Sequence, residues 1–171
     1  MYYCITKQKQ KEKISEKPSE KSNLKDIAKV LAVSFAGLFG RVMFQSIPSV
    51  EPLLALAIIT SFYKGPKYWL PMALSYVAAN SFMIGGQGFW SIAQFMGVLF
   101  AGIFASFKRG NLFKKLLGGA IIYELFVNSL WLPLFISPFI LLSSLPFSIV
   151  HITSTIGFGA FFESIRGKEN E

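Results

Sequence analysis

Several classes of residue are scarce in this chain, and each scarcity narrows what the protein can be. The single cysteine, Cys4, lies in a polar N-terminal stretch, which excludes a disulfide framework and a cysteine-based metal site. Charged residues make up only 15% of the 171 residues, whereas soluble domains average about 25%. The sequence also lacks a GxxxxGK[ST] phosphate-binding loop. We therefore expect no metal, no cofactor and no catalytic activity of its own.

The charges that are present avoid the middle of the chain. From Leu31 to Phe107, only Arg41, Glu51, Lys64 and Lys67 interrupt a long apolar tract, and 53% of all residues are hydrophobic. A soluble core of this size would leave too little polar surface to cover it. The net charge of +8 does not indicate nucleic-acid binding, because the basic residues gather in tails and short loops. The pattern predicts an all-α membrane protein that crosses the bilayer several times.

Six apolar spans indicate a six-transmembrane-helix bundle over residues 27–165. A Lys-rich tail, residues 1–26, precedes them without the apolar core of a signal peptide, and a short polar tail, residues 166–171, follows. The long tail is predicted to be solvated in the cytosol, and its lysines also permit binding to anionic lipid. The spans are predicted at about 27–46, 50–63, 67–84, 90–107, 112–135 and 145–165.

The distribution of basic residues predicts the orientation of these spans. Loops 46–50, 85–89 and 136–144 contain no Lys or Arg, whereas the loops at 64–67 and 108–115 and both tails are basic. Because cytosolic loops carry the excess of Lys and Arg, both termini are placed in the cytosol. Of the 17 basic residues, only Arg41 then lies away from the cytosolic surface. We expect a multi-pass protein of the cell membrane.

Two charged residues lie within the spans, and each has two interpretations. Arg41 either extends to the outer interface or faces an outward cavity, where Glu51 or an anionic ligand group pairs with it. Glu124 lies near the middle of the fifth span and shares a helix face with Asn128 and Trp131, while His151 reaches a similar depth. These groups form either a polar cluster that locks helices together or a site for a polar solute.

The second interpretation defines a candidate binding site near the outer side of the membrane. Its polar groups would orient the solute, and its tryptophans would stack on a flat ring. The candidate residues are Arg41, Gln45, Glu51, Asn80, Gln87, Trp90, Gln94, Glu124, Asn128, Trp131 and His151.

Small residues recur every four positions in two spans, which allows helices to approach closely. The row Gly97, Ala101 and Ala105 is predicted to pack inside the bundle. The row Ala32, Ala36 and Gly40 is predicted to bind another membrane protein.

Four segments in this order and spacing resemble one family. They are GRVMFQSIPSVEP (40–52), the Gly65-Pro66 pair, AANSFMIGGQGFWSIAQFMG (78–97) and LPFSIVHITSTIGFGAFF (145–162). The chain resembles the S component, the substrate-binding membrane subunit, of the energy-coupling factor (ECF) vitamin transporters of prokaryotes. The resemblance covers most of residues 28–165.

The resemblance implies an outward-facing cavity that binds a vitamin-like small molecule, with weak preference for cobalamin or a vitamin precursor. Loops 46–50 and 84–89 would close over it. Ala32 and Ala36 would contact the membrane T component, and two separate ATPase subunits would drive uptake. Three other functions stay open: an ion-coupled carrier that uses Glu124, a structural membrane protein, and an intramembrane enzyme with Glu124 and His151 as acid and base. A carrier is disfavoured by the lack of an internal repeat, and the enzyme by the lack of an evident nucleophile or metal set.

Overall fold

The computed structural model describes residues 20–82, 87–107, 110–129 and 138–168, and these residues are helical throughout apart from short connections. The prediction of an all-α fold is therefore confirmed. The elements are α2 (Glu20–Met43), α3 (Leu53–Lys64), a 3₁₀ turn η1 (Pro66–Tyr68), α4 (Trp69–Asn80), α5 (Trp90–Ser106), α6 (Leu112–Ser129) and α7 (Pro138–Lys168).

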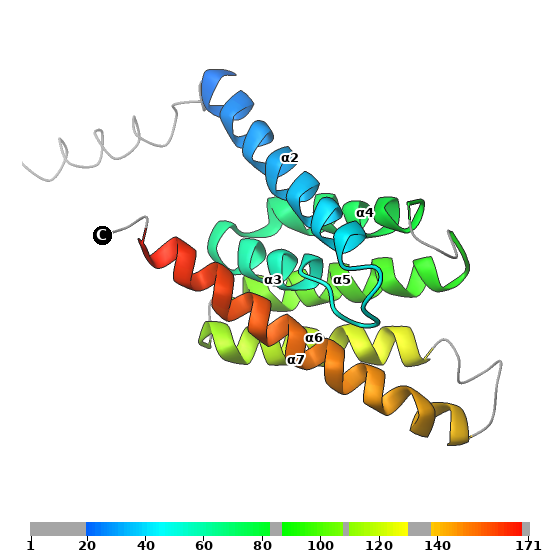
Figure 1. Ribbon diagram of the computed structural model, residues 1–171. Helices are drawn as coiled ribbons and strands as arrows, with labels where there is room; N and C mark the ends of the chain where they lie inside the picture. Colours follow the sequence, from blue (N-terminus) through cyan, green and yellow to red (C-terminus); the bar gives the residue numbers. More distant parts are fainter. Residues whose placement is uncertain (1–19, 83–86, 108–109, 130–137, 169–171) are drawn as a thin grey trace, which may run out of the picture.

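Successive helices run in opposite directions, and α3 lies at the centre of the bundle (Figure 1). Helix α3 contacts α2, α4, α5, α6 and α7. Most of its side chains are buried, and Leu53, Leu54 and Ile58 are fully so. Helix α3 is almost entirely apolar, so it is suited to a position enclosed by other helices.

Small residues bring α5 and α6 close together. A Cβ atom on Gly97 would lie 3.2 Å from the Cα of Tyr123 and 2.9 Å from its ring. Ala101 and Ala105, which continue the row one and two turns further along α5, are fully buried. The prediction that this row packs inside the bundle is confirmed.

Basic residues mark one end of the bundle. At this end, Lys67 donates a 2.5 Å hydrogen bond to Asp26, and Arg166 pairs with Glu163 at 2.6 Å. The hydrogen bond from Lys67 lowers the pKa of the Asp26 carboxyl below its usual value. Among the described residues, every Lys and Arg except Arg41 lies on this end, where α2 begins and α7 ends at the left of Figure 1.

The outer faces of the bundle are apolar. Large exposed side chains recur every four residues along α2 (Ile27, Leu31, Phe35, Phe39 and Met43) and along α6 (Phe113, Leu117, Ile121 and Leu125). Within the described residues, one helical stretch is long and apolar enough to cross a membrane, Leu142–Arg166. Only 17% of its most apolar window is buried inside the protein.

The described residues therefore show one such span, and the six-span arrangement stays a prediction. Helices α3 and α4 have 12 residues each, or about 18 Å at 1.5 Å per residue. Helix α5 has 17 residues and no charged side chain. Charged residues shorten the apolar part of α2, where they are Lys25, Asp26 and Lys29, and of α6, where they are Lys114, Lys115 and Glu124.

Several helix boundaries also differ from the predicted ones. Helix α2 begins at Glu20, inside the predicted tail, because Lys and Glu are good helix formers despite their charge. Helix α7 begins at Pro138, inside the predicted loop 136–144. Proline is well tolerated in the first turn of a helix, where its missing N–H has no partner to lose. The remainder of the predicted fifth span, residues 130–135, lies outside the described residues.

Substituting Gly97 by valine is expected to lower the free energy of unfolding by about 1–3 kcal/mol, because the new side chain overpacks the contact with Tyr123. Gly157→Val is the matched control, since a Cβ atom there has no neighbour within 4 Å. Thermal unfolding of both variants in detergent measures the difference. Equal melting temperatures would contradict close packing of α5 on α6.

Candidate functional site

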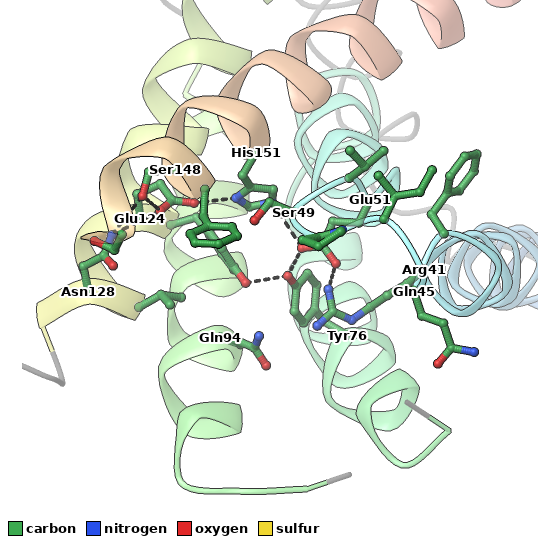
Figure 2. A pocket seen from close by; sticks show the side chains of 18 residues that line it. Arg41, Gln45, Ser49, Glu51, Tyr76, Gln94, Glu124, Asn128, Ser148 and His151 are labelled. Carbon is green, nitrogen blue, oxygen red and sulfur yellow. Dashed lines mark hydrogen bonds and ion pairs between the residues drawn. The ribbon is translucent and has the colours of Figure 1, made fainter. Parts of the chain in front are cut away.

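A cavity of about 270 Å³ lies at the end of the bundle opposite the basic residues. Its walls come from α2, α4, α5, α6, α7 and the segment between α2 and α3 (Figure 2). Polar side chains contribute much of the lining, and they are Arg41, Gln45, Ser49, Glu51, Tyr76, Gln94, Tyr123, Glu124, Asn128, Ser144, Ser148 and His151.

The connection between α2 and α3 places the first charged pair. Helix α2 ends at Met43, and the chain then turns through residues 44–52 with Ser49 at a φ of 60°. Gly40 allows the returning chain to approach, because a Cβ atom there would lie 2.5 Å from Cγ of Pro52. This close approach brings Glu51 beside Arg41.

Arg41 is buried and makes three contacts through its guanidinium, while its Nε has no hydrogen-bond partner among the described residues. Its guanidinium forms an ion pair with Glu51, donates a 2.9 Å hydrogen bond to Oδ1 of Asn80, and lies 3.8 Å above the ring of Tyr76. Its side chain is 5% exposed. Arg41 therefore pairs inside the bundle and does not extend to an interface.

Asn80 connects this pair to α5. Its amide nitrogen donates to Oγ of Ser91 at 3.0 Å and to Oε1 of Gln94 at 2.8 Å. Because Asn80 is buried behind the cavity wall and accepts from Arg41, it orients the charged groups without facing the cavity itself.

Glu124 forms the centre of a second polar group. One carboxylate oxygen accepts hydrogen bonds from Ser148 at 2.5 Å and Asn128 at 3.1 Å. The other lies 2.5 Å from Nδ1 of His151. An ionised carboxylate only accepts hydrogen bonds, so an ionised Glu124 requires a proton on Nδ1 of His151.

His151 and two tyrosines connect the polar contacts around Arg41 to those around Glu124. Nε2 of His151 lies 3.1 Å from Oε1 of Glu51, without hydrogen-bond geometry. The Tyr76 hydroxyl donates a hydrogen bond to the Glu51 carboxylate. The hydroxyl oxygen of Tyr123 lies 2.5 Å from that of Tyr76. A continuous polar network therefore connects α2, α4, α6 and α7 (Figure 2), and Asn80 joins α5 to it.

Seven of the predicted site residues meet in this network, and they are Arg41, Glu51, Asn80, Gln94, Glu124, Asn128 and His151. Gln45 lines the cavity, but its buried Oε1 has no hydrogen-bond partner among the described residues. Gln87 and Trp90 do not line the cavity. The amide of Gln87 donates to the carbonyl oxygen of Val77 at 2.6 Å and to Ser81 at 2.9 Å, away from the cavity. Trp90 is 37% exposed and lies over Gly88. Trp131 lies outside the described residues, as do residues 83–86 of the predicted closing loop 84–89. Segment 46–50 does line the cavity.

Sequence inspection missed Tyr76, Tyr123 and Ser148. Tyrosine and serine are unremarkable in apolar helices, so neither type stands out as a charged residue does. Helical spacing contained a usable signal, because Tyr76 precedes Asn80 by one turn and Ser148 precedes His151 by three residues.

The small residues of α2 point in two directions. Ala32 and Ala36 are exposed beside the apolar stripe of that helix, whereas Gly40 packs against Pro52 within the chain. Among the described residues, no three His, Cys, Asp or Glu side chains gather closely enough to hold a metal ion.

Comparison of the chain with family models, curated proteins and solved structures gave no match. The resemblance described above therefore rests on the quoted segments alone.

Arg41→Met is expected to lower the free energy of unfolding by about 3–5 kcal/mol, because it leaves the buried Glu51 carboxylate without its partner. Arg166→Met removes a cation from an exposed pair and is expected to leave the melting temperature nearly unchanged, because water screens that pair. Thermal unfolding compares the two variants. The double variant Arg41→Met/Glu51→Gln should recover part of the loss, and no recovery would contradict the importance of the buried charge.

Proposed function

We propose that this chain is the substrate-binding S component of an ECF-type importer and spans a prokaryotic cell membrane with its six helices. The apolar stripes on α2 and α6 support a lipid environment, since soluble proteins rarely expose apolar surface of this extent. The low burial of Leu142–Arg166 supports it too, because the core helix of a soluble protein is mostly buried. With the basic end in the cytosol, the cavity faces outward.

The cavity with its buried ionic network is the observation that carries the proposal. Charged side chains in apolar surroundings are costly and usually mark a functional site. Here the side chains of Glu51, Glu124 and His151 line a cavity, so other side chains do not enclose them completely. A volume of about 270 Å³ equals about nine liquid water molecules. That size suits a small vitamin or vitamin precursor and disfavours cobalamin, which is far larger.

The partners follow from what the chain itself lacks. Its sequence has no phosphate-binding loop, so two ATPase subunits would supply the energy. Ala32 and Ala36 leave a shallow, exposed strip on α2 where a helix of the T component can approach closely. The loaded S component would then release its solute inward through movement relative to that partner.

The order in which Ser148, Glu124 and His151 contact one another disfavours an enzymatic function. In a hydrolytic triad the imidazole lies between the hydroxyl and the carboxylate, and so activates the nucleophile. Here Ser148 and His151 both contact Glu124. The hydroxyl is therefore bound to the carboxylate, and the imidazole does not activate it.

An ion-coupled carrier is the second candidate, favoured by the chain of contacts from Glu124 through His151 to Glu51. Such chains of carboxylates and histidines conduct protons in pumps and carriers. Proteoliposomes that contain only this chain separate the two functions. Solute uptake driven by a pH gradient alone would favour the carrier over the S component.

Purified full-length protein is expected to bind one small solute from a panel of vitamins and precursors, with a dissociation constant below about 1 µM. Glu51→Gln and Glu124→Gln should each weaken binding at least about tenfold, since each removes a charge from the cavity. Glu163→Gln is the matched control, because that carboxylate lies at the basic end and contacts Tyr63 and Arg166.

Isothermal titration, together with mass spectrometry of co-purified molecules, measures the binding. Absence of any ligand from both experiments would contradict a solute-binding role and favour a structural one.

The double variant Ala32→Leu/Ala36→Leu is expected to lose co-purification with a T component and to keep solute binding, because leucine fills the strip where two helices approach. Ala160→Leu introduces the same side chain at an exposed position of α7 and serves as the control. Equal co-purification of both variants would place the partner surface elsewhere.

A further inference from the structure

We propose that the solute bound in this cavity carries a positive charge, as an ammonium group or a cationic nitrogen ring. This inference rests on the proposed binding function and specifies the chemistry of the same site. It follows from the balance of charge in the lining, from which charges the solute can reach, and from the aromatic walls.

The lining carries more fixed negative than positive charge. Arg41 contributes one positive charge, while Glu51 and Glu124 each contribute a negative one. Residues 83–86 and 130–137, which lie outside the described structure, contain no charged side chain in the sequence. An unbalanced carboxylate is costly in apolar surroundings. Either a proton on His151 or a cationic solute would balance the site.

The cation of Arg41 is not available to a solute. The guanidinium is enclosed by Glu51, Asn80 and the face of Tyr76. Its side chain is 5% exposed, compared with 9% for Glu51 and 14% for Glu124. Glu124 is therefore the most exposed of these three side chains, although its carboxylate also contacts Asn128, Ser148 and His151. A carboxylate attracts a cation and repels an anion.

Aromatic rings form much of the remaining wall. Phe44, Tyr123 and Phe147 line the cavity together with Tyr76. The faces of such rings attract cations, most strongly where water is excluded. Arg41 already covers one face of Tyr76. A small cation would therefore meet a carboxylate together with the rings of Phe44, Tyr123 and Phe147, whereas a neutral molecule of the same shape gains only the apolar contact.

Two pairs of probes with matched shape but different charge test the inference. The first pair is choline and its neutral carbon analogue dimethylbutanol. The second is the ring-methylated nicotinamide cation and neutral meta-toluamide, with anionic meta-toluate as a third member. Ligand-induced shifts of the melting temperature of the full-length protein, titrated to millimolar concentration, yield relative affinities. We expect at least one cation to bind about tenfold more tightly than its neutral analogue.

Two isosteric substitutions test whether the carboxylate of Glu124 causes the preference for a cation. Glu124→Gln should reduce it to within about twofold, because the accessible carboxylate is lost. Asn128→Asp should increase it, because a second carboxylate is added beside the first. The control Glu163→Gln should leave the preference unchanged, since Glu163 lies at the other end of the bundle.

Equal or tighter binding of the neutral or anionic analogues would overturn the inference, and so would failure of every cation to bind. Binding of a neutral or anionic vitamin in the panel described above would then leave the solute-binding function intact and reject only the cationic charge. Failure of the whole panel would reject both.

Discussion

The ion pair between Arg41 and Glu51 is the interaction on which the rest of the structure depends. A lone charge at this depth in an apolar bundle costs at least about 2.5–3.5 kcal/mol. Pairing requires the chain to return from α2 within a few residues, which Gly40 permits by its contact with Pro52. Helix α4 then holds the guanidinium in one place, because Oδ1 of Asn80 accepts a hydrogen bond from it and the ring face of Tyr76 lies against it.

Sequence inspection predicted the charged members of the site because each conflicts with its apolar surroundings. Arg41, Glu124 and His151 stand out for that reason, and the structure joins all three in one network. Tyr76 and Tyr123 could not be predicted, since a buried tyrosine is ordinary until its hydroxyl is seen to find a carboxylate. Which polar residues turn away, as Gln87 does, depends on tertiary contacts that spacing does not encode.

The all-helical fold and the basic end were predictable from composition, whereas helix lengths were not. Apolar runs define where a helix is stable, but charged residues extend α2 into the predicted tail. The short α3 and α4 show a further effect of packing. Helix α3 contacts five other helices, and a helix surrounded by protein need not match the thickness of a bilayer. Helix α4 contacts α2, α3 and α5.

The segment directly before Glu51 forms part of the cavity wall. It consists of residues 46–50, and the Ser154 hydroxyl donates to the carbonyl oxygen of Ser49 at 3.1 Å. Glu51 follows directly and holds Arg41. Displacing this segment would separate a buried ion pair, which is costly unless another charge compensates. Movement of this segment would therefore change the charge balance of the cavity, because both depend on the Glu51 carboxylate.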